Sequence, residues 1–137
     1  MPESDRASIE DFNRQHALGE AEVQRRLERA VMGSDYGATS YTTRSQANDL
    51  AERLRLGPGV DLIDLGAGTG WPGLYLAAKT GCRVVLADQP MEGLRIAQRR
   101  AVADGLHNGS LIVRCAGQRL PFHPETFDAA THADVLC

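Results

Sequence analysis

The stretch that most constrains the fold is residues 60–73, which read Val-Asp-Leu-Ile-Asp-Leu-Gly-Ala-Gly-Thr-Gly-Trp-Pro-Gly. An apolar run of strand length, with an acid near its end, breaks here into alternating glycines, and residues 71–79 then show a helical pattern. The alternation continues with predicted strands at 83–88, 110–115 and 127–132 and a predicted helix at 90–104. Strands that alternate with helices predict an α/β fold, a Rossmann-like parallel sheet with helices on both faces.

Two helical segments are predicted before this alternation. Residues 1–20 are polar and lack an apolar stripe, which indicates a loosely held arm or a marginal helix. The next segment has four apolar residues at helical spacing, which predict a helix with one apolar face: Val23, Leu27, Ala30 and Val31. Gly33 is expected to end this helix. A second amphipathic helix begins near Thr42 or Thr43. We divide the chain into a helical arm, residues 1–35, and a domain, residues 36–137, whose boundary is the point at which the family resemblance described below begins.

Composition removes several classes of function. The 137 residues suffice for one core without a disulfide or a structural metal, and the formal net charge of -3 does not favour nucleic acid as a partner. Cys82, Cys115 and Cys137 form no Cys-x-x-Cys pair, so no metal site is expected. No apolar run approaches the ~20 residues of a membrane span, and no leader is seen. A cytoplasmic protein that does not bind membranes is expected.

The glycine turn follows the first predicted strand, where a parallel α/β sheet binds its ligand. Residues 68–73 satisfy the Gly-x-Gly-x-x-Gly pattern of dinucleotide binding, and Asp88 lies about 20 residues further on, where a ribose would be bound. A nucleoside that carries a positive charge fits the turn as well. A plain turn without a ligand is disfavoured, because three alternating glycines each lose backbone entropy on folding.

Charge separates the two classes of ligand. A pyrophosphate would bind at the N-terminus of the helix at 71–79, where free N–H groups and the helix dipole attract anions. Asp64 lies two residues before Gly66, and we expect its carboxylate to point into the same crevice, repelling a phosphate and attracting an ammonium or a sulfonium. Asp88, at the end of the second strand, suits a ribose diol with either ligand. The pattern therefore favours a cationic nucleoside over NAD or FAD.

Three segments in a fixed order carry a family resemblance: residues 60–70, residues 84–88 (Val-Val-Leu-Ala-Asp), and Leu-Pro-Phe at 120–122 before Phe127 and Asp128. With them, the chain from about residue 36 resembles the class I S-adenosylmethionine-dependent methyltransferases, of the methyltransferase type 11 kind. The resemblance implies S-adenosylmethionine as cofactor and a small-molecule methyl acceptor. It also implies a set of cofactor-binding residues, namely Asp64, Gly66, Ala67, Gly68, Thr69 and Gly70 at the methionine end, Asp88 at the ribose, and Gln89 and Pro90 beside the adenine.

The sequence departs from this family in two places. Ala116 occupies the position of the acid that commonly meets the adenine amino group, and Gly117 or Gln118 is expected to replace that contact. The chain also stops after its fourth strand, where the family usually has seven strands. A truncated sheet leaves an unpaired edge, which predicts a homodimer or a completing partner.

Methyl transfer from a sulfonium needs positioning and desolvation, and a base only where the acceptor requires one. His132 and Asp134 follow the fourth strand and are the candidate catalytic residues. Tyr36 and Tyr41 are expected in a lid over the cofactor or the substrate. Arg95, Arg99 and Arg100 are interpreted as a solvated face of the helix at 90–104. The alternatives to an active methyltransferase are a truncated, partner-dependent remnant and, less favoured, an NAD- or FAD-dependent oxidoreductase.

Overall fold

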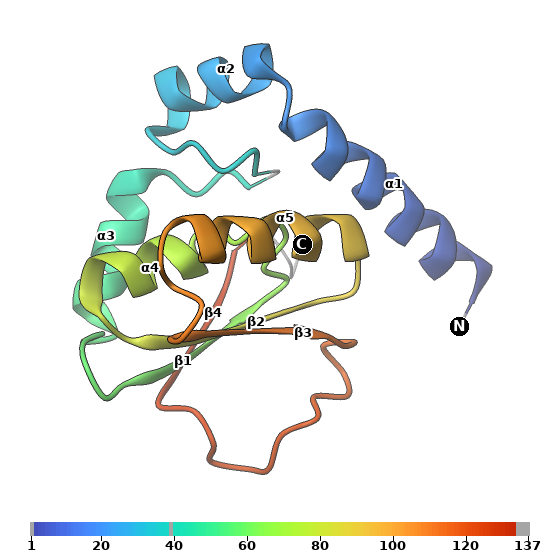
Figure 1. The fold of residues 1–137 in the computed structure, drawn as a ribbon. Helices are drawn as coiled ribbons and strands as arrows, with labels where there is room; N and C mark the ends of the chain where they lie inside the picture. Colours follow the sequence, from blue (N-terminus) through green and yellow to red (C-terminus); the bar gives the residue numbers. More distant parts are fainter. Residues whose placement is uncertain (1, 39, 134–137) are drawn as a thin grey trace.

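The computed structural model describes residues 2–38 and 40–133 (Figure 1). It begins with three helices and continues with the predicted alternation of strands and helices. The elements are α1 (Glu3–Gly19), α2 (Glu22–Met32), α3 (Arg44–Arg53), β1 (Asp61–Leu65), α4 (Gly73–Thr80), β2 (Arg83–Asp88), α5 (Met91–Ala103), β3 (Ser110–Arg114) and β4 (Ala129–His132).

The four strands form one parallel sheet in the order β3-β2-β1-β4. In its register, Leu65 at the end of β1 lies between Ala87 of β2 and His132 of β4. Asp88 at the end of β2 lies beside Arg114 of β3. The predicted α/β fold is confirmed, and the carboxyl ends of all four strands meet at one edge, next to the glycine turn. Among the described strands, β4 has a neighbour only on its β1 side.

The helices cover one face of the sheet (Figure 1). The two crossovers β1-α4-β2 and β2-α5-β3 advance in the same direction, and because parallel crossovers are right-handed, both helices lie on the same face. The segment 115–128, which leads to β4, runs along the opposite side without a helix. The expected helices on both faces are therefore found on one face only in the described part of the chain.

The core lies between the sheet and these helices. Leu62, Val84 and Leu86 from the strands and Leu74 and Leu76 from α4 are buried there. The ends of the helices follow the predicted signals: the Thr43 side chain accepts a hydrogen bond from the Gln46 N–H in a capping box at α3, and Gly33 ends α2 in the left-handed conformation.

The N-terminal segment follows one of its two predicted alternatives. Residues 3–19 form a helix, α1, and not a loosely held arm, because α1 packs against α5 and buries His16. Helix α2 is present, but its predicted apolar face is exposed, by 79% at Val23, 57% at Leu27 and 66% at Val31. Its buried side chain is Glu28, whose carboxylate holds the loop that follows the helix.

Candidate functional site

The glycine turn is folded back onto the end of β2. Gly66, Gly68 and Gly70 have φ angles of 68°, 52° and 97°, in the left-handed region that disfavours residues with a Cβ. The N–H groups of Gly66 and Ala67 both donate to the Ala87 carbonyl, at 2.8 and 3.2 Å. These bonds hold the turn in one shape. Because three of its five residues are glycines, few side chains cover its backbone next to the strand ends.

Asp88 joins this turn to the beginning of α5. Its Oδ2 accepts a 2.8 Å hydrogen bond from the Gly68 N–H, and its Oδ1 accepts a 2.8 Å bond from the Gln89 N–H. The residue is half-buried, and a carboxylate with about four lone-pair sites still has capacity for two hydroxyl donors. Gln89 is half-buried and Pro90 is buried, and both directly follow the end of β2.

Asp64 does not lie as predicted. Its side chain does not point into an open crevice: the residue is 1% exposed, and its Oδ2 accepts a 3.0 Å bond from the Gly73 N–H while its Oδ1 accepts a 2.9 Å bond from the Thr131 hydroxyl. Burial raises the pKa of Asp64 to about 7 against the effect of these hydrogen bonds. The carboxyl therefore braces β1, β4 and α4 from within, and a direct contact with a ligand is excluded in this arrangement.

The same contact closes the N-terminus of α4 to anions. Pro72 has no N–H, the Gly73 N–H is taken by Asp64, and the Leu74 N–H donates to the Gly70 carbonyl at 2.8 Å. A helix N-terminus binds phosphate through its free N–H groups. At α4 these three positions offer none.

Two buried polar atoms near the turn have no hydrogen-bond partner among the described residues: Thr69 Oγ1 and His16 Nδ1. The family resemblance implies that Thr69 lies at the cofactor. His16 was missed, because it lies on a polar helix without a periodic apolar signal, and only the fold brings it to Gly68.

The segment after β3 starts beside Asp88. The Cys115 N–H donates to the Asp88 carbonyl at 3.0 Å, and Arg114 Nε donates to the Gln89 carbonyl at 3.0 Å. Gly117 and Gln118 follow in an exposed turn. Their backbone is thus close to the position expected for an adenine, while the side chain of Gln118 faces solvent.

The candidate catalytic residue His132 is exposed at the carboxyl end of β4, beside Leu65 in the register. It therefore lies at the same sheet edge as the glycine turn, which starts at Gly66. Asp134, the other candidate, lies outside the described residues.

The tyrosines predicted for a lid have different surroundings. The Tyr36 ring packs on Trp71, with centroids 5.1 Å apart, and the Arg100 guanidinium lies 4.1 Å from its centroid on the ring face. Burial raises the pKa of Tyr36 to about 12. Tyr36 is thus a packing residue between Trp71 and α5. Arg100 packs on this ring, so the prediction that Arg100 belongs to a solvated face is wrong. Tyr41, by contrast, is 82% exposed.

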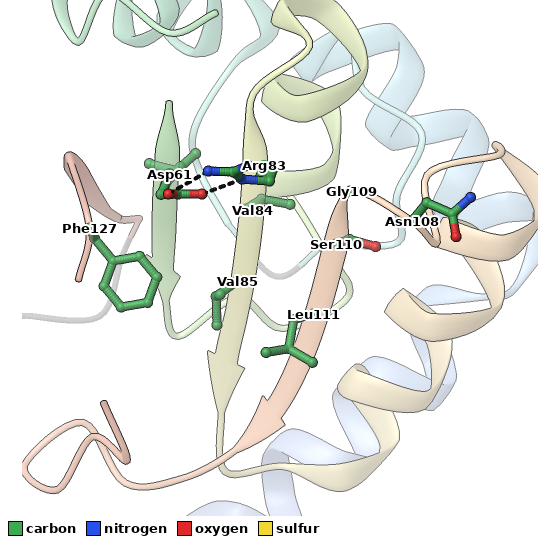
Figure 2. A pocket seen from close by; sticks show the side chains of 10 residues that line it. Asp61, Arg83, Val84, Val85, Asn108, Gly109, Ser110, Leu111 and Phe127 are labelled. Atoms are coloured by element: carbon green, nitrogen blue, oxygen red, sulfur yellow. Dashed lines mark hydrogen bonds and ion pairs between the residues drawn. The ribbon is translucent and has the colours of Figure 1, made fainter. Parts of the chain in front are cut away.

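A separate hollow of about 200 Å³ lies at the other ends of the strands (Figure 2). Its lining includes Asp61 and Arg83, which form a two-point ion pair at 2.6 and 2.7 Å, and Ser110 at the beginning of β3. These are the amino ends of the strands, away from the glycine turn.

In residues 2–38 and 40–133 we find neither a cluster of three side chains able to hold a metal ion nor a helix long and apolar enough to cross a membrane.

Known methyltransferases resemble this chain in sequence and in fold. Residues 62–137 match the family model described as a methyltransferase domain. Methyltransferase GfsG of Streptomyces halstedii is 33% identical over 79 residues, which cover 58% of this chain and 28% of that protein. Sterol methyltransferase-like 1 of Botryococcus braunii is 31% identical over 88 residues, covering 64% and 23%.

Among solved structures, a SAM-dependent methyltransferase from Thiobacillus denitrificans, in complex with S-adenosyl-L-homocysteine, superimposes with a TM-score of 0.62 at 23% identity, over 78% of this chain and 42% of that one. This chain spans about a quarter of the length of the two curated relatives. Because the family model matches more than half of the residues, the chain belongs to the methyltransferase-domain family.

Proposed function

We propose that this chain binds S-adenosylmethionine and takes part in methyl transfer to a small-molecule acceptor. The family match supports methyl transfer, and the bound S-adenosyl-L-homocysteine in a structural relative supports this cofactor. The net charge of -3 supports a small molecule over nucleic acid as acceptor.

The observation that carries the proposal is the closed N-terminus of α4. A dinucleotide would place its pyrophosphate on the free N–H groups there. Because the Gly73 and Leu74 N–H groups are already bonded and Pro72 has none, these three positions at the N-terminus of α4 offer a diphosphate no free N–H group. The exclusion of phosphate thus rests on the hydrogen bond that Asp64 accepts from the Gly73 N–H, and not on an exposed charge on Asp64.

The residues at the turn fit an S-adenosyl nucleoside. Asp88 retains acceptor capacity for the ribose hydroxyls, and Gly66 to Gly70 allow the methionine part close to the backbone. Gln89, Pro90 and the backbone near Gly117 would flank the adenine.

When bound, this cofactor supplies a methyl group on a positively charged sulfur that is already a good leaving group. The chain then contributes mainly position and exclusion of water. Where the acceptor atom carries a proton, His132 at the end of β4 would take that proton onto its imidazole as the methyl group is transferred.

Calorimetry separates the cofactor classes. We expect the wild-type chain to bind S-adenosylmethionine and not NAD, and Asp88→Ala to abolish the heat of binding. Asp61→Ala is the matched control, because Asp61 lies at the other end of the neighbouring strand. Saturable binding of NAD without binding of S-adenosylmethionine would refute the proposal, and undiminished binding by Asp88→Ala would refute the site.

The outer edge of β4 favours a second possibility, in which this unit works with a partner or as a homodimer. On that side β4 has no neighbouring strand among the described residues, and such an edge can accept another strand. Size-exclusion chromatography tests it, because a stable monomer at high concentration would contradict pairing through this edge.

A further inference from the structure

The imidazole of His16 is enclosed although it lies on a polar helix, α1, whose other side chains are mostly exposed. The residue is 3% exposed on helix α1, and its Nδ1 has no hydrogen-bond partner in the described structure. Its ring stacks on Phe12, with centroids 6.2 Å apart. A histidine on the solvent-exposed face of a helix would be hydrated, so the burial of His16 indicates a specific contact.

Two glycines of the cofactor region make the room for this ring. A Cβ on Gly68 would lie 3.1 Å from His16 Cε1, and a Cβ on Gly93 would lie 2.8 Å from His16 Cδ2. Gly68 is the middle glycine of the turn, and Gly93 is in the first turn of α5. His16 therefore contacts the backbone of both segments that carry the predicted cofactor contacts.

A second contact of α1 fixes its position. Asn13 Oδ1 accepts a 2.9 Å hydrogen bond from the Glu92 N–H at the N-terminus of α5. Asn13 and His16 are three residues apart, on one face of α1, and both are directed at α5. Helix α1 is thus held in one position by Asn13 and His16, next to the carboxyl ends of the strands where Asp88 and the glycine turn lie. We call this position the seat of α1.

We propose that His16 is a positioning residue for the cofactor: its imidazole packs α1 against Gly68 and Gly93 and so keeps the Gly68 N–H on the Asp88 carboxylate. This inference rests on the proposed function. The link is short, because Gly68 is both the residue that His16 contacts and the donor of the 2.8 Å bond to Asp88 Oδ2. When α1 moves away, Gly68 loses its packing partner, and of the two hydrogen bonds that orient the Asp88 carboxylate only the one from the Gln89 N–H is still supported.

The charge on His16 controls this seat. The charged groups that face the imidazole are Asp88 at the end of β2 and Glu92 on α5. Burial nevertheless lowers the pKa of His16 below its ordinary 6.5, because burial outweighs the attraction of the two carboxylates. The seated form therefore prefers the neutral ring, and seating is lost as the pH falls from 6.5 toward the lowered pKa.

The test measures S-adenosylmethionine binding between about pH 5 and about pH 8 by calorimetry, together with hydrogen exchange of the Glu92 amide without cofactor. The Glu92 amide reports the seat of α1 directly, because it donates to Asn13. The variants are His16→Gln, which cannot titrate, Asn13→Ala, which removes the second contact, and His107→Gln, an exposed histidine as matched control.

We expect the wild type to lose affinity below pH 6.5, by at most about tenfold per pH unit, with a parallel loss of Glu92 protection. His16→Gln should bind more weakly than the wild type at about pH 8, with a flat pH profile, whereas Asn13→Ala should bind more weakly and keep the pH dependence. His107→Gln should match the wild type.

Three outcomes would overturn the inference. A wild-type pH profile in His16→Gln would remove His16 from the effect, and unchanged Glu92 protection at low pH would show that α1 stays seated. Absence of cofactor binding by the wild type at every pH would refute the proposed function and, with it, the coupling to the cofactor. The last result is distinguishable from the first two because Glu92 exchange needs no cofactor.

Discussion

The Asp64 carboxylate and the Gly73 N–H are joined by a 3.0 Å hydrogen bond between the end of β1 and the beginning of α4. This bond puts a carboxyl group at the place where a dinucleotide-binding turn leaves room for phosphate. It also fixes the span of the glycine turn, because the turn is the connection between these two residues. One buried contact therefore helps to shape the turn and occupies the N–H group of Gly73 at the beginning of α4.

Asp64 should make the stability of the protein fall as the pH rises. Its folded pKa of about 7 lies above its ordinary 3.8, so the folded state binds the proton more tightly than the unfolded state does. The free energy of unfolding should then decrease between pH 3.8 and about 7, by on the order of 4 kcal/mol, and stay level above. In Asp64→Asn this contribution is absent. The difference between the free energies of unfolding of the wild type and Asp64→Asn, measured by urea unfolding, should therefore change with pH across this range. A constant difference would contradict the prediction, and Asp104→Asn, at an exposed position, is the control.

Gly73→Ala should be strongly destabilising. A Cβ at this position would lie 2.6 Å from Asp64 Oδ2 and 2.5 Å from Leu86 Cδ2, inside a packed core. Overpacking of this kind costs about 1–3 kcal/mol or more, and it would also disturb the Asp64 bond. Gly57→Ala is the control, because no heavy atom lies within 4 Å of a Cβ there. Equal urea midpoints for the two variants would contradict this account.

The sequence predicted the parts of the site that depend on backbone conformation and strand order. Alternating glycines require an unusual turn, and Asp88 ends a strand that must pair beside the first. The direction of Asp64 could not be predicted in the same way, because β1 is buried at Leu62, Ile63 and Asp64 in succession and shows no alternation. Likewise, His16 is found only through contacts between distant segments.

Helix α2 shows the other limit of sequence reasoning. The spacing of its apolar residues correctly predicts a helix, but it does not tell which face is buried. We expect Leu27→Gln to change the free energy of unfolding by no more than about 0.5 kcal/mol, because Leu27 is 57% exposed. Leu74→Ala, at a side chain with 0% exposure in the core, should cost about 2–5 kcal/mol. A large loss in Leu27→Gln, measured by urea unfolding, would show that its face is covered in solution.

Glu28 carries the burial that the apolar face of α2 does not. Its carboxylate accepts hydrogen bonds from the Ser34 hydroxyl at 2.6 Å, the Tyr36 N–H at 2.9 Å and the Gly37 N–H at 2.6 Å. In Glu28→Gln one acceptor oxygen becomes an NH₂ group that faces backbone donors, so at least one buried N–H or O–H group loses its partner. Such a loss costs about 1–3 kcal/mol.

The effect of Glu28→Gln should be visible at Trp71, the one tryptophan in the sequence, because its ring packs on Tyr36 at 5.1 Å. We expect a lower urea midpoint and altered tryptophan fluorescence in the native state, since a loosened loop releases the Tyr36 ring. Glu52→Gln, at an exposed position of α3, should leave both unchanged. A native fluorescence identical to that of the wild type would show that the loop from Ser34 to Gly37 keeps its shape without the carboxylate, because the Tyr36 ring cannot stay on Trp71 unless its backbone does.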